Sequence, residues 1–80
     1  MLTLYYRPGC LFYHKLLDTI EELGINVEER DISDPAIAAE LVARGSKLQV
    51  PYLVDSERAV EMYESMNIIA YLREHYPKLV

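Results

Sequence analysis

The sequence predicts an α/β fold in which three helices cover a four-stranded mixed sheet, in the order β-α-β-α-β-β-α. Three observations lead to this prediction. Apolar residues switch between the period of a strand and that of a helix, Gly and Pro separate these segments, and the last two strands follow each other directly. The chain has 80 residues, 51% hydrophobic and 26% charged, and we expect residues 1–80 to form a single domain.

The chain begins with a predicted strand and a predicted helix that are joined by a turn. Residues 2–6 are apolar and aromatic, which is typical of a strand, and residues 7–9 (Arg-Pro-Gly) predict the turn. Over residues 10–23, apolar side chains recur at the spacing of an amphipathic helix. Gly24 is suited to end this helix, because glycine tolerates a left-handed backbone.

A second strand and a second helix follow. Residues 25–32 alternate between apolar and polar side chains and predict a strand. Ser33 or Asp34 can cap the next helix, which has Pro35 in its first position and ends at Gly45. Because a helix joins the first two strands, we expect these strands to be parallel, with a right-handed crossover.

The rest of the chain predicts a hairpin and a third helix. Residues 52–54 and 58–63 predict two antiparallel strands, with a turn at residues 55–57 between them. Residues 64–76 again place apolar side chains at helical spacing, and Pro77 ends this helix.

The charge and the cysteine content argue against several classes of function. The net charge is −5 and the pI is about 4.9, so we expect no binding to nucleic acid or to a membrane, because their phosphates attract cationic surfaces. No apolar run approaches the roughly 18 residues that can span a bilayer. The single cysteine excludes an intramolecular disulfide and is typical of a reducing compartment. We therefore expect a cytoplasmic location, and we expect a monomer.

Three motifs point to a family. The segment YYRPGC resembles the approach to the active site in glutaredoxins, and VPYLVD resembles the valine–proline strand of the same fold. The segment YESMNIIAYLREHYP is similar to the N-terminal domain of glutathione S-transferases, in which Glu-Ser precedes an isoleucine and then Tyr-Leu. The resemblance implies a thioredoxin-like fold and glutathione as a co-substrate. It also implies glutathionylated or disulfide-containing substrates, and we expect no metal.

The single cysteine is the candidate nucleophile. Cys10 follows Pro-Gly and opens the first predicted helix, where free N–H groups and the helix dipole favour a thiolate. Arg7 adds a nearby cation, and the alternative is that Cys10 is a small buried apolar residue. Dithiol glutaredoxins have a second cysteine where this chain has Tyr13. A mixed disulfide on Cys10 must then be released by an external thiol, which the resemblance identifies as glutathione.

Two dipeptides are candidate ligand-binding sites. An X-Pro bond in a folded protein is cis in only about 5–6% of cases, so the sequence alone favours a trans Pro51. The resemblance implies a cis Pro51 that faces the cysteine, with the backbone of Val50 free to pair with the cysteinyl part of glutathione. Glu64 and Ser65 can cap the last helix. The resemblance implies that they also bind the γ-glutamyl end of glutathione, with its carboxylate at the helix N-terminus.

Four further residues have possible roles around the cysteine. Arg7 can bind the glycyl carboxylate of glutathione or remain solvated, and Phe12 can flank the site or be an isolated exposed aromatic. Tyr13 is expected to place its ring in the core, while its hydroxyl finds a polar partner. Tyr6 is a possible auxiliary residue, because some transferases activate glutathione with a hydroxyl near this strand end. Tyr13 is a second possible auxiliary residue.

Three functional hypotheses follow. The first is a monothiol glutaredoxin-like thiol–disulfide oxidoreductase that acts through a mixed disulfide between Cys10 and glutathione. The second is a non-catalytic module of the glutathione S-transferase N-terminal type, which binds glutathione or a protein. The third is an iron–sulfur carrier ligated by Cys10 and glutathione, and it is the least favoured, because Leu11 and Tyr13 are bulky where that class has small residues.

Overall fold

The computed structural model describes residues 2–9 and 11–76, with only the backbone of Leu11 and Phe12. The described residues form four strands and three helices in the predicted order. These elements are β1 (Leu2–Tyr6), α1 (Leu11–Leu23), β2 (Val27–Asp31), α2 (Pro35–Gly45), β3 (Tyr52–Asp55), β4 (Val60–Tyr63) and α3 (Ser65–His75).

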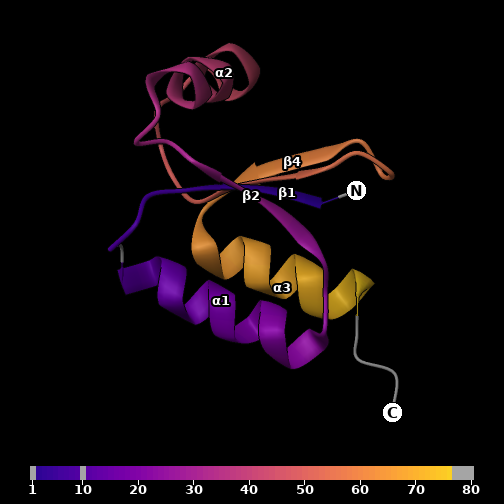
Figure 1. The fold of residues 1–80 in the computed structure, drawn as a ribbon. Helices are drawn as coiled ribbons and strands as arrows, with labels where there is room; N and C mark the ends of the chain where they lie inside the picture. The colour runs from indigo at the N-terminus through magenta and orange to yellow at the C-terminus, as the bar shows by residue number, and fades with distance from the viewer. Residues whose placement is uncertain (1, 10, 77–80) are drawn as a thin grey trace.

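The four strands form one mixed sheet in the order β2-β1-β3-β4. Strand β1 pairs with β2 in parallel and with β3 in antiparallel orientation, and β3 and β4 form an antiparallel hairpin. Helices α1 and α3 cover one face of this sheet and α2 covers the other (Figure 1). The predicted fold class is therefore confirmed, as are the parallel first pair and the hairpin.

The main core lies between the sheet and the pair of helices α1 and α3. Because side chains alternate along a strand, Leu2 and Leu4 face these helices, whereas Tyr5 faces α2. The side chains that close this core are fully buried and come from the sheet and from both helices: Leu4, Leu16, Leu53, Ile68 and Leu72. Burial of a side chain of this size contributes roughly 1.5–3 kcal/mol to the stability of the fold. These five side chains are therefore a major source of that stability.

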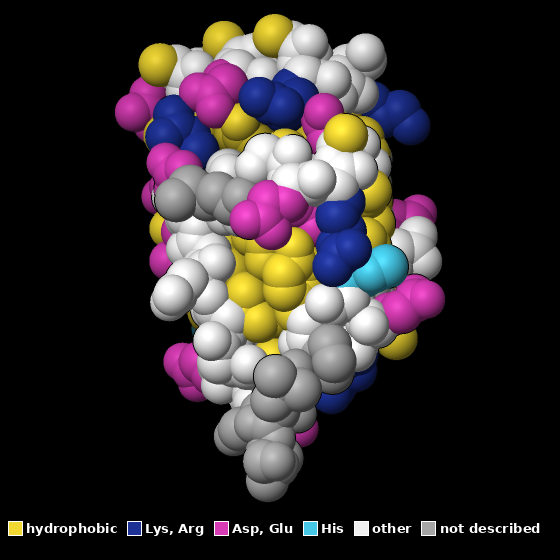
Figure 2. Space-filling view, turned by 90° about the vertical axis from the view of Figure 1, so that its right-hand side faces the viewer, with side chains coloured by type: hydrophobic (Ala, Val, Ile, Leu, Met, Phe, Trp, Pro, Cys, Tyr) yellow, Lys and Arg dark blue, Asp and Glu magenta, His cyan; other side chains and the backbone are white. Residues whose placement is uncertain are grey.

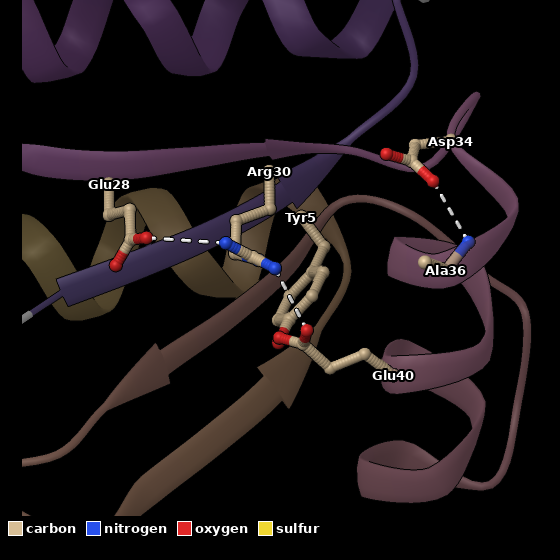
Figure 3. Close-up of polar contacts among 6 residues, drawn as sticks. All are labelled: Tyr5, Glu28, Arg30, Asp34, Ala36 and Glu40. Carbon is tan, nitrogen blue, oxygen red and sulfur yellow. Dashed lines mark hydrogen bonds and ion pairs between the residues drawn. The ribbon is translucent and has the colours of Figure 1, made fainter.

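Helix α2 is held to the opposite face by both apolar and polar contacts. Its only fully buried side chain is Leu41, whereas the next residue, Val42, is 43% exposed. Glu40 accepts a hydrogen bond from the hydroxyl of Tyr5, and its other oxygen lies 2.9 Å from Nη2 of Arg30 (Figure 3). The helix begins as predicted, since the carboxylate of Asp34 accepts a hydrogen bond from the N–H of Ala36 (Figure 3).

Two predicted boundaries differ from the structure, for local reasons. Strand β2 begins at Val27 because the N–H of Ile25 is already bonded to the carbonyl of Ile20 and completes the end of α1 at Gly24. Residues 56–59 form a turn, so β4 begins at Val60 rather than at residue 58.

Asp55 was predicted to be part of that turn but is the last residue of β3, with 0% exposure. Its carboxylate accepts hydrogen bonds from the hydroxyls of Tyr71 (2.6 Å) and Tyr76 (2.7 Å) and from the N–H of Glu57 (3.1 Å). The N–H and Nε of Arg58 also approach this carboxylate, at 3.4 and 3.7 Å. Asp55 therefore joins the hairpin turn, through its contacts with Glu57 and Arg58, to the last helical segment, through its bonds with the two tyrosines.

A hollow lies at the end of the sheet where β1 begins and α1 and α3 end. Its volume is about 350 Å³, and its lining includes Leu2, Leu23, Ile25 and Tyr76. Figure 2 shows apolar side chains gathered between charged ones on this face. Within residues 2–9 and 11–76, no helix is long and apolar enough to cross a membrane.

Candidate functional site

The hairpin brings together the two predicted ligand-binding dipeptides. Tyr52 at the start of β3 pairs with Tyr63 at the end of β4, so the residues just before β3 lie beside those just after β4. A groove of about 320 Å³ forms there, lined by Gln49, Val50, Pro51, Glu64, Ser65 and Met66. It lies at the end of the sheet opposite to the hollow beside Leu2 and Tyr76, and it contains four of the predicted site residues.

The Val50-Pro51 peptide bond is cis, as the family resemblance implies. Pro51 is buried and Val50 is half-buried. Among the described residues, neither the N–H nor the C=O of Val50 has a hydrogen-bond partner. These two groups are therefore free to pair with an extended ligand.

The N-terminus of α3 forms the other wall of the groove. The carbonyl of Glu64 accepts the hydrogen bond from Ile68, and the N–H groups of Ser65, Met66 and Asn67 have no partner within the described part of the chain. The side chain of Glu64 makes no cap, so its predicted capping role is wrong. Its carboxylate instead accepts a 3.3 Å bond from the Asn67 side chain. Free N–H groups and the helix dipole make this end of α3 suitable for an anion.

Glu64 has a backbone conformation that is unfavourable for an L-residue. Its φ is +71°, in the region where glycine is normally found. Non-glycine residues in such conformations are concentrated at binding and active sites, where the surrounding structure enforces them.

The candidate nucleophile, Cys10, lies outside the described residues, and so does the side chain of Phe12. Helix α1 begins at Leu11, so Cys10 directly precedes its first turn in the sequence. Arg7 is exposed in the connection between β1 and α1, has no ion pair among the described residues and does not line the groove. The roles of these three residues stay predictions.

Tyr6 and Tyr13 form a stacked pair on the face of the sheet that α1 covers. Their ring centroids are 4.4 Å apart and their planes differ by 11°. Tyr13 is 7% exposed and donates a hydrogen bond of 2.6 Å from its hydroxyl to Oε1 of Glu29, which confirms its predicted buried ring and polar partner. Burial and the Glu29 carboxylate raise the pKa of Tyr13 above its ordinary value, so the hydroxyl remains a donor at neutral pH.

The hydroxyl of Tyr6 lies within the influence of acidic groups on β2. Burial, followed by the charges of Asp31 and Glu29, raises the pKa of Tyr6. Neither Tyr6 nor Tyr13 lines the groove. Their auxiliary roles concern Cys10, which lies outside the described residues, and these roles therefore stay predictions.

Three residues of this region had no role in the sequence analysis. Gln49 and Met66 line the groove beside the predicted dipeptides. Gln49 precedes Val50 and Met66 follows Ser65 in the sequence, so their position next to the dipeptides could have indicated a place in the site. Glu29 is 16 residues from Tyr13, and only the pairing of β1 with β2 brings it to the start of α1.

Comparisons with solved structures agree with this fold. An omega-class glutathione transferase 3C from Trametes versicolor superposes with a TM-score of 0.83 at 20% identity, covering 99% of this chain and 35% of that chain. An epsilon-class glutathione S-transferase from the housefly, Musca domestica, gives 0.80 at 22% identity, covering 99% and 37%. Glutathione S-transferase 1-6 from Anopheles dirus species B gives 0.79 at 25% identity, covering 96% and 37%. The chain thus spans little more than a third of these proteins.

The architecture and the cis proline beside the groove define a thioredoxin-like domain. Residues 4–78 match the family described as "Glutathione S-transferase, N-terminal domain". The chain belongs to this family. Comparison with curated protein sequences gave no match.

Proposed function

We propose that this protein binds glutathione in the groove between Val50-Pro51 and Glu64-Ser65 and exchanges thiols at Cys10. The observation that carries this proposal is the groove itself, which joins two dipeptides 14 residues apart in the sequence, counted from Val50 to Glu64. The family resemblance implies that these dipeptides bind two adjacent parts of one tripeptide, the cysteinyl and the γ-glutamyl part. Membership of a family named for glutathione S-transferases supports the choice of ligand.

The free groups of the groove match the chemistry of glutathione. The γ-glutamyl carboxylate accepts hydrogen bonds from the N–H groups at the start of α3 and from the hydroxyl of Ser65. The γ-glutamyl ammonium pairs with the carboxylate of Glu64. The cysteinyl part pairs with the free N–H and C=O of Val50 as an added strand does. Outside the groove, the exposed Arg7 is the proposed partner of the glycyl carboxylate.

The reaction is a pair of thiol–disulfide exchanges. The thiolate of Cys10 attacks the glutathionyl sulfur of a mixed disulfide, a new S–S bond forms to Cys10, and the substrate leaves as a thiolate that takes a proton. A second glutathione thiolate then attacks the sulfur of glutathione in the Cys10 adduct. Glutathione disulfide leaves and the Cys10 thiolate is regenerated. The net change is one mixed disulfide and one glutathione converted into one substrate thiol and one glutathione disulfide, in a reducing compartment such as the cytoplasm.

A second candidate function is glutathione binding without turnover. It is favoured by one observation: the family that residues 4–78 match is described as the glutathione S-transferase N-terminal domain. In this case the groove binds glutathione, and Cys10 takes no part in any chemistry.

Two measurements on the same variants separate these candidates. The first is reduction of a glutathionylated substrate by wild type, Cys10→Ser and Ser65→Ala, and the second is titration with reduced glutathione followed by nuclear magnetic resonance. If the protein catalyses thiol exchange, the wild type turns over the substrate, Cys10→Ser loses this turnover and Ser65→Ala shows a lower rate. If the protein only binds glutathione, the titration changes the chemical shifts of Val50, Glu64 and Ser65. The wild type and Cys10→Ser then reduce the substrate at the same background rate. An absence of shifts in this groove would contradict both candidates.

A further inference from the structure

Tyr63 connects the two walls of the groove. It is the last residue of β4 and directly precedes Glu64 and Ser65, which line one wall. Its side chain is half-buried, and its hydroxyl donates to the carbonyl oxygen of Gly45 at 2.8 Å and to that of Lys47 at 3.1 Å. These two carbonyl groups lie at the start of the segment that leads to the other wall. One residue thus contacts both sides of the groove through the chain itself and through its hydroxyl.

The segment between α2 and the groove has few other contacts that hold it. Residues 46–49 are exposed, so burial does not fix their conformation. Within residues 2–9 and 11–76, the backbone of residues 47–50 makes a single hydrogen bond, which the carbonyl of Lys47 accepts from Tyr63. The ammonium of Lys47 also lies 5.9 Å from the centroid of the Tyr63 ring. Tyr63 is therefore the main polar anchor of this segment.

The anchor matters for the groove because the segment ends at Val50. The side chain of Val50 packs against the apolar cluster beneath α2, but this packing leaves its N–H and C=O unbonded. The proposed ligand pairs with these two groups as an added strand does, which requires a defined backbone direction. A backbone that is already ordered in that direction spares the ligand the entropic cost of ordering it.

We propose that Tyr63 is a positioning residue of the groove, whose hydroxyl holds the segment before Val50 in the conformation that binds the cysteinyl part of glutathione. This inference rests on the proposed binding of glutathione. Tyr63 itself does not line the groove, so it acts through the segment and not by contact with the ligand.

The aromatic pair to which Tyr63 belongs provides a matched control. Tyr52 pairs with Tyr63 in the hairpin, and their ring centroids are 4.4 Å apart. The hydroxyl of Tyr52 donates to the carboxylate of Glu61 on β4 and makes no bond to the segment before Val50. Tyr63→Phe and Tyr52→Phe therefore each remove one hydroxyl and keep the ring, but only the first releases the segment.

The first test is the affinity for reduced glutathione, measured by calorimetric titration of the intact chain at a temperature where circular dichroism shows each variant folded. Tyr63→Phe is expected to weaken binding by about three- to tenfold, because roughly one hydrogen bond that orders the groove is lost. Tyr52→Phe is expected to stay within about twofold of wild type. Equal affinities for Tyr63→Phe and wild type, or equal losses in both variants, would overturn the inference.

The second test needs no ligand. Backbone amide relaxation, measured by nuclear magnetic resonance on the free protein, gives order parameters for residues 47–50. These values should fall in Tyr63→Phe and stay unchanged in Tyr52→Phe, and unchanged values in Tyr63→Phe would also overturn the inference. If wild type does not bind glutathione but the order parameters fall in Tyr63→Phe alone, the proposed function fails and the positioning of this segment stands. If wild type and Tyr63→Phe bind equally well, the proposed ligand stands and the positioning role fails.

Discussion

The hydroxyl of Tyr63 donates hydrogen bonds to the carbonyl oxygen of Gly45 at 2.8 Å and to that of Lys47 at 3.1 Å. One side chain of β4 thus binds the end of α2 and the start of the segment that leads to Val50-Pro51. A Cβ atom at Gly45 would lie 2.2 Å from this hydroxyl oxygen and 3.2 Å from Cζ of Tyr52. Residue 45 is therefore a glycine because of close contact with the sheet, and its own φ is not positive.

The first prediction concerns Gly45→Ala. In an exposed helix interior this change stabilises by about 0.5–1 kcal/mol. Here we expect it to destabilise by about 1–3 kcal/mol, because the added methyl group displaces the ring of Tyr63. Urea unfolding followed by circular dichroism measures the difference. The double variant Gly45→Ala/Tyr63→Phe should cost less than the sum of the two single variants, because the closest contact is absent. Additive costs, or a gain in stability from Gly45→Ala alone, would show that no close contact exists.

The second prediction concerns acid unfolding and Asp55. Burial acts to raise the pKa of Asp55, but hydrogen bonds from Tyr71, Tyr76 and the N–H groups of Glu57 and Arg58 outweigh it, and the pKa is lowered below 3.8. The stability that this group contributes is therefore present above its unfolded pKa and is lost as the pH falls through the lower, folded value.

Asp55→Asn tests this prediction. We expect it to reduce the free energy of unfolding at pH 7 by about 1–3 kcal/mol, because two tyrosine hydroxyls lose a charged acceptor. The stability of the variant should depend less on pH below about 4 than that of wild type. Urea midpoints measured between pH 2 and pH 7, about the range in which carboxylates titrate, provide the comparison. Parallel curves for the two proteins would contradict the lowered pKa.

The third prediction concerns alkaline pH and Tyr71. Burial, followed by the hydrogen bond to Asp55, raises the pKa of Tyr71 from 10.0 to about 12. Its contribution to stability is complete below the unfolded value and is lost as the pH rises through the folded one. Tyr71→Phe should therefore be less stable than wild type at pH 7, and the two stability curves should converge as the pH approaches about 12. A constant difference across this range would mean that Tyr71 titrates normally.

The fourth prediction concerns Glu64, whose φ of +71° is unfavourable for a side chain. Glu64→Gly should stabilise the fold by about 1 kcal/mol, because glycine adopts this conformation without strain. It should also weaken glutathione binding, because the proposed partner of the ammonium group is lost. Thermal unfolding and calorimetric titration measure the two effects. Glu64→Gln is the control, since it keeps the backbone strain while losing the charge, and it should lower affinity without raising stability. A gain in both stability and affinity for Glu64→Gly would contradict a binding role.

The sequence determined the elements of this fold and the types of residue that its site needs. Apolar periodicity fixed the order β-α-β-α-β-β-α, and Asp34, Pro35 and Gly24 marked the helix ends, because these signals act between residues that are close in the chain. The dipeptides Val50-Pro51 and Glu64-Ser65 were recognisable by their resemblance to a family. Neither dipeptide, taken alone, indicated that it faces the other.

The tertiary structure decided which of these residues meet. The register that pairs Tyr52 with Tyr63 brings Pro51 beside Glu64, and the parallel pairing of β1 with β2 places Glu29 at the hydroxyl of Tyr13. Asp55 looked like a turn residue in the sequence and is instead a buried acceptor for two tyrosines of the last helical segment. Each of these contacts joins residues that are distant in the chain. Their formation depends on strand register and helix packing, which a local pattern of apolar and polar residues does not encode.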